Sequence, residues 1–508
     1  MRGSSQRGKG LWSLLAAALL LSWLLPITAL AAEEPAVAST GAIVVDFQTD
    51  QVYYEKDADL ARPAASMTKV MSVYLVFEEI AAGRLSLDSY VTAGVRAANI
   101  SQNRAYSGLE RLRAGESYQV DILLRLIMTA SCNGSVLVLA EHIGGTEEAF
   151  VQRMNDTAAA WGIDAHFADS CGFVDEGNAV SPRAMAYIAK RIITDYPQIL
   201  EYSALPETYF QGKTFYSTNT LLRNGTCEGI DGLKSGTTDG AGYCYTGTAL
   251  RDGRRIISVV MNSTGYSARM NDTKNLLEYG FQCRAQQEEL WRKTEQALQA
   301  ELSPEDGPVW PYGETTLSAR LSGVEGEIPC TVSWELNGQS VGEPETALLL
   351  QEGAEIKANF FAPGEENFTA ALLLTFPDGA VVRREAELPA GEGEVSFSGR
   401  LGLSRAELYP EAELRIPLRV TCDQGAVLSI PAGWYLDGEP IPYYQNPAFR
   451  IGPEGGASGY TLKGEDLPAG EHILEFRLNP QGLPGVEQTA FAARLLVLDD
   501  AEPADQAA

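Results

Sequence analysis

Residues 229–262 read GIDGLKSGTTDGAGYCYTGTALRDGRRIISVVMN. Three runs in this stretch are rich in β-branched and aromatic residues, and an Asp-Gly pair separates each run from the next. We expect strands over 230–236, 243–249 and 255–262, with tight turns at Asp239-Gly240 and Asp252-Gly253. The stretch therefore predicts an antiparallel meander.

Patterns on the N- and C-terminal sides of this meander predict a domain of the α+β class. Residues 41–54 alternate around a turn, which is typical of a hairpin. Apolar side chains at 67, 70, 71, 74 and 77 follow the helical period, so a helix is expected over 66–82. Further helices are expected over 121–143 with a break at 131–134, over 182–193 and over 271–281. Strands at both ends with helices between them suggest that the terminal strands share one sheet.

The composition of the 508-residue chain is that of a globular protein, with 45% hydrophobic and 21% charged residues. The formal net charge of −28 argues against nucleic acid as a partner. Only three histidines are present, which argues against an imidazole-rich metal site and leaves few candidates for a Ser-His-Asp hydrolase. We expect no bound metal and no cofactor. The seven cysteines are an odd number, so at least one thiol stays unpaired, and no disulfide is assigned from spacing.

The charge is unevenly distributed along the chain. Residues 1–300 hold 27 basic and 33 acidic side chains, whereas residues 301–508 hold 12 and 34. A polar helical stretch at 286–301 and a linker-like PEDGP segment at 304–308 lie at the transition. Short β-like runs follow. The acidic half therefore predicts separate, all-β structure.

A repeated pattern subdivides this acidic half. WELNG at 334–338 has a counterpart, WYLDG, at 434–438, and each places Asn-Gly or Asp-Gly after a Trp-x-Leu strand. Two β-sandwich modules of the immunoglobulin type are expected, with Trp334 and Trp434 as core residues. The alternative is two unrelated hairpins in one larger β domain.

The first 32 residues have the character of an export signal. A basic start is followed by an apolar run over 11–25 and by Ala29-Leu30-Ala31, a suitable cleavage site. An uncleaved N-terminal anchor is the alternative. Either way, we expect an extracytoplasmic protein, secreted or associated with the cell wall. The C-terminal residues 498–508 are acidic, so no C-terminal membrane anchor is evident.

The tetrapeptide Ser66-Met67-Thr68-Lys69 carries the sharpest chemical signal. Residues three apart lie on one face of a helix, so Ser66 Oγ and Lys69 Nζ can meet. A hydroxyl nucleophile needs a neighbour to take its proton, and a lysine in an enclosed site can lose its charge and do so. Taken alone, the spacing is weak, because such tetrapeptides often arise by chance.

Two further segments strengthen this signal. Ser131-Cys132-Asn133 lies at the expected break between helices, and Lys234-Ser235-Gly236-Thr237 lies at the end of an expected strand. In this order, the three segments resemble the motifs of the penicillin-recognising serine enzymes. The flanking sequence over about residues 40–283 is similar to that of the serine-type D-alanyl-D-alanine carboxypeptidases, the low-molecular-mass penicillin-binding proteins. The implied fold is a β-lactamase/transpeptidase-like domain with an antiparallel sheet and helices.

This resemblance implies roles for the residues of the first two motifs. Ser66 would attack the carbonyl between the last two D-alanines of a peptidoglycan stem peptide, and Lys69 would accept its proton. Ser131 would relay that proton to the departing amine, while Asn133 would hold the substrate backbone. β-Lactam antibiotics are implied as covalent ligands of Ser66.

The resemblance also implies a binding site for the terminal carboxylate of the substrate. Lys234 would supply positive potential, and Ser235 and Arg269 would bind the carboxylate. Gly236 completes the third motif, and the N–H groups of Ser66 and Thr237 would form the oxyanion hole.

Some positions depart from the family pattern. Ser235 replaces the commoner Thr, Cys132 fills a variable position, and Asn178 stands where a His is frequent. The family usually has a single β domain and an amphipathic C-terminus, which puts membrane attachment by that route in doubt. The expected organisation is a signal peptide at 1–32, the catalytic domain at 33–285, a helical linker at 286–308, sandwiches at 309–400 and 401–498, and a disordered acidic tail at 499–508.

Three functional hypotheses follow. The first is an exported D-alanyl-D-alanine carboxypeptidase. The second is a β-lactamase or D-amino-acid esterase of the same superfamily, but no counterpart of the extra deacylating Glu of class A enzymes follows Asn133. The third is a non-enzymatic wall-binding protein, although loss of the serine and lysines would have favoured it.

Overall fold

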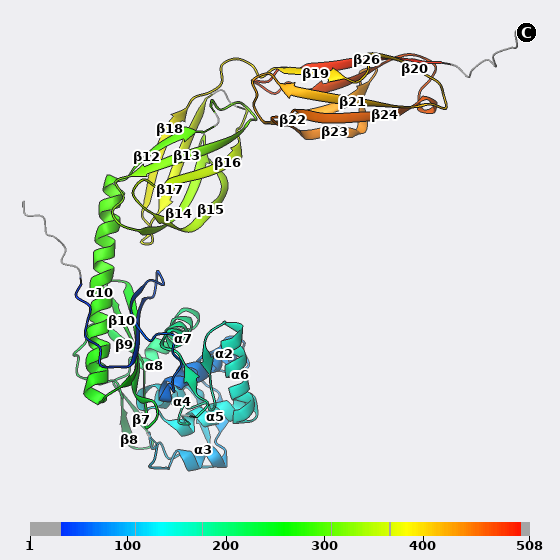
Figure 1. Ribbon diagram of the computed structural model, residues 1–508. Helices are drawn as coiled ribbons and strands as arrows, with labels where there is room; N and C mark the ends of the chain where they lie inside the picture. Colours follow the sequence, from blue (N-terminus) through cyan, green and yellow to red (C-terminus); the bar gives the residue numbers. More distant parts are fainter. Residues whose placement is uncertain (1–31, 107, 175, 306, 365–366, 499–508) are drawn as a thin grey trace, which may run out of the picture. The chain divides into compact units, whose positions relative to one another are not determined.

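The computed structural model describes residues 32–498 except 107, 175, 306 and 365–366 (Figure 1). It divides into two compact units, 1–287 and 288–508, and each is considered separately. Apart from Ala32, the expected export segment and the expected acidic tail lie outside the described residues. No helix in the described part of the chain has both the length and the apolar character to cross a membrane.

An antiparallel five-stranded sheet forms the frame of the first unit. Its order is β2-β1-β11-β10-β9, so the predicted meander is present. The strands are β1 (Gly41–Asp46), β2 (Val52–Lys56), β9 (Ile230–Thr238), β10 (Gly242–Arg251) and β11 (Arg254–Ser263). Because β1 pairs with β11, strands from the two ends of the domain share one sheet, as expected.

Helices between these strands build the larger core of the first unit. The helix α2 (Lys69–Ala81) is buried over most of its surface and packs against α5, α6 and α7 (Figure 1). The other longer helices with residues in this core are α4 (Val120–Ala130), α5 (Asn133–Gly144), α6 (Glu147–Ala160) and α7 (Pro182–Asp195). The predicted break lies between α4 and α5. Shorter helices are α3 (Val95–Ile100), α8 (Ile199–Ser203) and α9 (Thr220–Arg223).

Three two-stranded ribbons complete the first unit. They pair β3 (Tyr90–Thr92) with β4 (Ser117–Gln119), β5 (Ala165–His166) with β6 (Ala179–Val180), and β7 (Glu207–Phe210) with β8 (Lys213–Tyr216).

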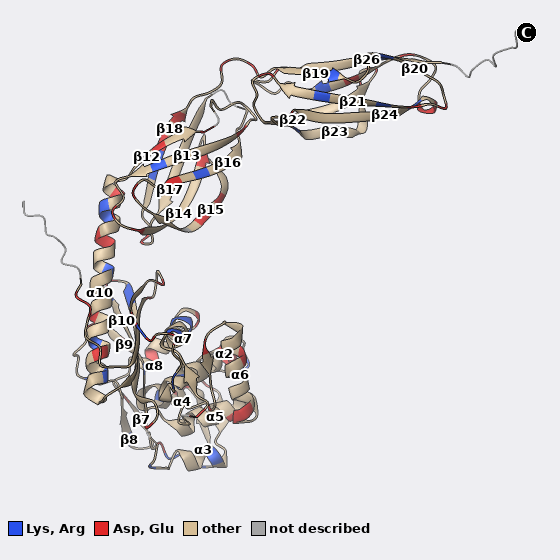
Figure 2. Ribbon diagram, in the orientation of Figure 1, with Lys and Arg blue, Asp and Glu red and all other residues tan. Residues whose placement is uncertain are grey.

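The region expected to be a linker differs in the structure. The helix α10 (Tyr266–Ala297) runs without interruption through the helical stretch expected at 271–281 and most of the one expected at 286–301, and Figure 2 shows charges of both signs along it. Strand β12 (Gln299–Pro304) follows and pairs with β13. Packing accounts for the difference: Leu276 and Leu277 are buried with strand residues of the first unit, and Trp291 is buried in a core of the second.

Two sheets in the second unit share the core that contains Trp334. One has the order β12-β13-β16 and the other β15-β14-β17-β18. Their strands are β13 (Glu314–Ser322), β14 (Ile328–Leu336), β15 (Gln339–Leu350), β16 (Glu355–Phe361), β17 (Phe368–Thr375) and β18 (Val381–Leu388). Alternate residues of β14 are buried, as a sheet with one face on a core requires.

A second pair of sheets has its own core around Trp434. The orders are β19-β21-β24 and β20-β26-β25-β22-β23. The strands are β19 (Phe397–Leu401), β20 (Arg405–Leu408), β21 (Glu413–Cys422), β22 (Leu428–Leu436), β23 (Glu439–Ile451), β24 (Gly456–Lys463), β25 (Gly470–Leu478) and β26 (Thr489–Val497). Trp334 and Trp434 are 5% and 1% exposed, which confirms both as core residues.

The two repeated pentapeptides form equivalent turns. Asn337-Gly338 joins β14 to β15, and Asp437-Gly438 joins β22 to β23. All four residues have positive φ, which matches the twist of the flanking strands. The hairpin predicted at each pentapeptide is therefore confirmed.

His472 ties two loops to β25. Its Nδ1 lies 2.6 Å from Asp437 Oδ2 and its Nε2 lies 2.8 Å from the Pro468 carbonyl oxygen. Both partners are acceptors, so the doubly protonated ring satisfies both. The hydrogen bond to Asp437, and then that to Pro468, raises the pKa of His472. This contribution to stability is present below the unfolded pKa of about 6.5 and is lost as pH rises through the raised folded value.

We predict that His472→Gln destabilises the second unit in acid and has less effect in alkali. At about pH 5.5 its thermal unfolding midpoint should fall by at most about 4 °C, because such pairs contribute about 0–1 kcal/mol. The difference from the wild type should shrink as the pH passes the raised pKa. Differential scanning calorimetry across pH measures this, with Glu471→Gln as the neighbouring exposed control. An unchanging difference at all pH values would contradict a role for the charged ring.

Candidate active site

Ser66 lies in the short turn that leads into α2, here called the Ser66 turn (Ala65–Thr68). Lys69 opens α2, and its Nζ donates a hydrogen bond to Ser66 Oγ at 2.7 Å. Ser66 is partly accessible, whereas Lys69 is fully buried. Ala65 has a φ of 48°, a left-handed value that residues with a Cβ rarely adopt, so surrounding structure must hold the turn in place.

The environment of Lys69 favours its neutral form. Burial lowers the pKa of Lys69, because an ammonium group inside the protein loses its hydration. Four nearby groups partly oppose this effect: Cys171, Asp169, Cys132 and Glu110. Nζ also donates to the Cys171 carbonyl oxygen at 2.8 Å. The result is an amine that gives up its proton more readily than a surface lysine, as a general base requires.

The break between α4 and α5 carries Ser131 and Asn133. Ser131 ends α4 with a φ of 61°, and Asn133 begins α5. Both residues are buried, and neither Ser131 Oγ nor Asn133 Oδ1 has a hydrogen-bond partner among the described residues. Buried polar atoms are nearly always paired in native proteins. These two atoms therefore suit contacts with a polar ligand.

Glu110 is a buried acid behind this break that our sequence reasoning missed. Its Oε1 accepts a hydrogen bond from the N–H of Ser135 at 2.8 Å, in the first turn of α5. Burial raises the pKa of Glu110 to about 7. A carboxylate is favoured at a helix N-terminus, so Glu110 helps to hold the start of α5. No motif marks this residue, because only the tertiary fold brings its loop to α5.

The third motif lies on β9, beside the Ser66 turn. A Cβ on Gly236 would lie 2.8 Å from both the Ala64 carbonyl oxygen and the Ser66 backbone nitrogen, so glycine permits the close approach. Lys234 is 2% exposed and donates from Nζ to the Ser235 carbonyl oxygen at 3.0 Å. Burial lowers the pKa of Lys234 well below its usual value, and the charges of Lys69 and Arg269 add to this.

Arg269, on α10, supports the end of β9. Its Nη1 donates to the Gly236 carbonyl oxygen and to Thr237 Oγ1, both at 3.0 Å, and to the Cys244 carbonyl oxygen at 3.3 Å. Its guanidinium carbon lies 4.9 Å from the centre of the Tyr266 ring. Burial lowers the pKa of Arg269. Besides lining the site, this arginine therefore has a backbone-holding role that the sequence did not indicate.

A cavity of about 460 Å³ brings most of the predicted residues together. Six of the nine line it: Ser66, Ser131, Ser235, Gly236, Thr237 and Arg269. Lys69, Asn133 and Lys234 do not line it and are buried. Lys69 is nevertheless joined to the cavity through its hydrogen bond to Ser66.

The cavity also contains residues that sequence reasoning missed. Thr218 Oγ1 accepts a hydrogen bond from Ser235 Oγ at 2.8 Å. Arg223 lies over the Tyr216 ring at 5.8 Å, and all three residues line the cavity. They belong to the segment from β8 through α9, which carries no recognisable motif and reaches the site only because it folds beside β9.

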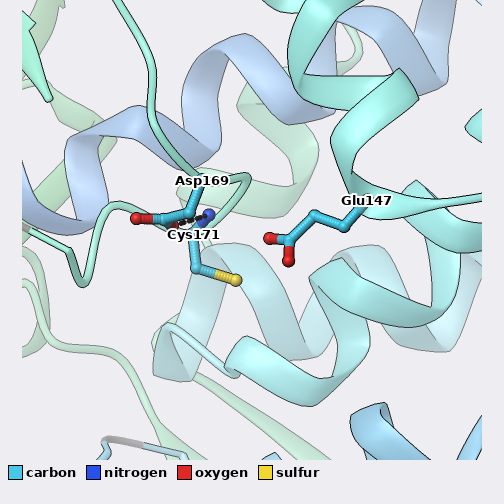
Figure 3. A group of neighbouring side chains, drawn as sticks. All are labelled: Glu147, Asp169 and Cys171. Carbon is cyan, nitrogen blue, oxygen red and sulfur yellow. Dashed lines mark hydrogen bonds between the residues drawn. The ribbon is translucent and has the colours of Figure 1, made fainter. Parts of the chain in front are cut away.

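One group of side chains in the described part of the chain has the composition of a metal site. The ligand atoms of Glu147, Asp169 and Cys171 lie within 4.8 Å of one another (Figure 3). However, Glu147 Oε2 forms an ion pair with Arg96 at 2.5 Å, and both oxygens of Asp169 accept hydrogen bonds from their own loop. Burial raises the pKa of the Cys171 thiol to about 12, which keeps it protonated. The donor set is therefore engaged in protein contacts and fits a metal poorly.

Comparison with known proteins assigns the first unit to a family. Residues 28–265 match the sequence model of the D-alanyl-D-alanine carboxypeptidases. Carboxypeptidase DacA of Escherichia coli (strain K12) is 33% identical over 254 residues, which is 49% of this chain and 62% of that protein. DacC of the same organism is 32% identical over 276 residues, which is 53% of this chain and 68% of that protein.

Some solved structures are also similar in sequence to this chain. The ampicillin-bound form of penicillin-binding protein D2 from Listeria monocytogenes is 30% identical, with 49% of this chain and 99% of that chain covered and a TM-score of 0.43. On the sequence relationships, this chain belongs to the D-alanyl-D-alanine carboxypeptidase family. It spans about 62% of the length of DacA.

The close approach of β9 to the Ser66 turn leads to a prediction. Gly236→Ala should separate the two segments, because the new methyl group would overlap the backbone around Ser66. Acylation by labelled penicillin should slow by about 100-fold, the effect of losing one oxyanion-stabilising donor. The second-order rate constant of adduct formation measures this.

Gly265→Ala is the matched control. A Cβ at Gly265 meets no atom within 4 Å, and this glycine does not have a positive φ. Its acylation rate should equal that of the wild type. A Gly236→Ala protein that reacts at the wild-type rate would show that the contact is dispensable.

Proposed function

We propose that this chain is an exported D-alanyl-D-alanine carboxypeptidase, which removes the terminal D-Ala from peptidoglycan stem peptides through an acyl-enzyme on Ser66. The observation that carries the proposal is the 2.7 Å hydrogen bond between Ser66 Oγ and the buried Lys69 Nζ. A poor nucleophile is thus paired with an amine whose pKa is lowered by burial.

In the acylation step, neutral Lys69 takes the hydroxyl proton as Ser66 Oγ bonds to the carbonyl carbon between the two D-alanines. The N–H groups of Ser66 and Thr237 stabilise the negative oxygen that develops. The bond to the D-Ala nitrogen then breaks, and the proton passes through Ser131 to that nitrogen. Ser131 Oγ suits this relay because it lines the cavity and has no hydrogen-bond partner in the described protein.

In the deacylation step, water attacks the ester carbon and the Ser66 oxygen leaves with a proton. Asn133 holds the substrate backbone from the start of α5, where its Oδ1 is unpaired among the described residues. The same lysine serves both halves of the reaction, since it can accept the proton of the water as it accepted that of the serine.

Ser235 and Arg269 bind the free carboxylate of the substrate, and the buried Lys234 supplies positive potential beside them. Burial keeps the pKa of Lys234 low, and an incoming carboxylate favours the charged lysine. Ser235 and Arg269 line the cavity, and the Nε of Arg269 has no partner in the described protein. The carboxylate therefore exchanges a hydrated state for contacts with fixed cations.

We further propose that residues 33–285 form the catalytic domain and that 309–400 and 401–498 form two immunoglobulin-like sandwiches. Two separate cores and the two equivalent turns support the division. The acidic surface of these modules keeps an exported protein soluble.

The proposal predicts that Ser66→Ala forms no penicillin adduct and releases no D-alanine. Lys69→Ala should remain folded and also fail to acylate, because it removes the amine that is hydrogen-bonded to Ser66 Oγ. In the wild type, acylation should rise with pH through the pKa of Lys69, which burial places below its usual value. Labelled penicillin and a peptide ending in D-Ala-D-Ala are the two probes.

Each alternative has its own outcome in this experiment. Rapid penicillin turnover would favour a β-lactamase or esterase. Neither adduct nor release would favour a non-enzymatic wall-binding protein. Acylation by Lys69→Ala would mean that another group is the base.

A second prediction concerns recognition of the terminal carboxylate. The wild type should release D-Ala far more slowly when the C-terminus of the peptide is amidated. Arg269→Ala should lose about tenfold or more in kcat/KM on the free acid and much less on the amide, because charge-assisted contacts are worth about 1.5–3 kcal/mol. Equal losses on the two peptides would mean that Arg269 only supports the end of β9.

A further inference from the structure

The orientation of Lys69 depends on a loop outside the three motifs. We call residues 169–174 the Asp169 loop. Lys69 Nζ donates hydrogen bonds to Ser66 Oγ and to the Cys171 carbonyl oxygen of this loop. One turn along α2, Ser72 Oγ donates to the Ser170 carbonyl oxygen at 2.6 Å. The loop thus contacts α2 through two consecutive carbonyl groups.

The Asp169 loop is also pressed against the Ser66 turn. A Cβ on Gly172 would lie 1.9 Å from the Ala65 carbonyl oxygen and 2.5 Å from Thr68 Oγ1. Gly172 has a φ of 72°, so glycine is needed both for space and for conformation. Small displacements of this loop therefore move the surroundings of both Ser66 and Lys69.

A single buried carboxylate organises this loop. Asp169 Oδ1 accepts hydrogen bonds from the N–H groups of Cys171 at 2.7 Å and Gly172 at 2.5 Å, with a longer one from Phe173. Its Oδ2 accepts from the N–H of Val174 at 2.9 Å and from Asn178 Nδ2 at 3.0 Å. Asp169 is 4% exposed. The peptide unit that precedes Gly172 therefore has its N–H on Asp169 and its carbonyl on Lys69.

Glu147, on α6, holds the loop at a different point. Its Oε1 accepts from the N–H of Ser170 at 3.0 Å and from Ser170 Oγ at 2.6 Å, while its Oε2 is paired with Arg96. Figure 3 shows the Asp169 carboxylate at the Cys171 backbone and the Glu147 carboxylate approaching from its own helix. Glu147 therefore offers a matched comparison: it supports the same loop, but its charge is neutralised locally.

We propose that Asp169 is a positioning residue for the general base: it fixes the Cys171 carbonyl that orients Lys69 Nζ toward Ser66. The proposal rests on the proposed function for the role of Lys69. The contacts of the loop are independent of that function.

The charged and titratable groups around Lys69 determine the sign of the effect. Cys171 and Asp169 face it from the loop, Cys132 from the start of α5, Glu110 from its own loop, and Lys234 from β9. Burial lowers the pKa of Lys69, and the negative charge of Asp169 partly offsets this by raising it. Removing this charge lets the pKa fall further, so the acid limb of acylation moves to lower pH.

The test compares Asp169→Asn with Glu147→Gln in the full-length protein. Acylation by labelled penicillin is measured from about pH 5 to about pH 9, and the titration of Lys69 is followed separately by NMR of carbon-labelled lysine, assigned with Lys69→Arg. Asp169→Asn should react about tenfold more slowly at the plateau, with both the acid limb and the Lys69 titration shifted to lower pH.

Glu147→Gln should lower the thermal unfolding midpoint, because it removes the ion pair between Glu147 and Arg96, yet the Lys69 titration should stay in place. An equal shift in the two variants, or no shift in folded Asp169→Asn, would overturn the proposal. If the wild type forms no adduct, the proposed function fails, but the substrate-free NMR titration still decides the role of Asp169.

Asn178→Ala is the second variant, in case Asp169→Asn does not fold. It removes one hydrogen bond to Asp169 Oδ2, the contact with the Val174 carbonyl and the hydrogen bond that Asn178 Oδ1 accepts from the N–H of Ala168, but it keeps the Asp169 charge. Acylation should slow severalfold with an unchanged Lys69 titration. A wild-type rate in this variant would mean that the loop does not position Lys69.

Discussion

The enclosure of Lys69 is the constraint on which the rest of the first unit depends. An amine in water stays charged at neutral pH and cannot take a proton from a hydroxyl, so the amine must be removed from water. The protein achieves this by surrounding α2 with other helices and by covering its first turn with β9 and the Asp169 loop. The hydrogen bond between Lys69 Nζ and Ser66 Oγ then holds this amine beside the serine hydroxyl.

This enclosure explains several residues that have no chemistry of their own. Gly236 lets β9 approach the Ser66 turn, and Gly172 lets the Asp169 loop do so from another direction. Glu110 holds the start of α5 near the same centre. The two glycines allow close packing, and Glu110 accepts a hydrogen bond from a backbone N–H group. Together these contacts keep Lys69 buried, and this burial lowers its pKa.

The second unit follows simpler rules. Alternating apolar residues build its two cores, and Asn-Gly and Asp-Gly turns set the hairpins that carry Trp334 and Trp434. Because these signals are local, they were readable from the sequence. The region that joins the two units was not, since a charged helix and a loop have similar polar composition, and only the burial of Trp291 and the pairing of β12 decide between them.

The amino-acid sequence alone determined the meander, most helices and the three motifs that meet at Ser66. Periodicity, turn chemistry and short spacings are properties of neighbouring residues, so they can be read without the fold. Only the tertiary structure decided which distant groups surround Lys69. Asp169, Glu110 and Thr218 lie in segments without a motif, and their importance arises from desolvation and from hydrogen bonds across the fold. Such effects depend on three-dimensional proximity, which no local pattern encodes.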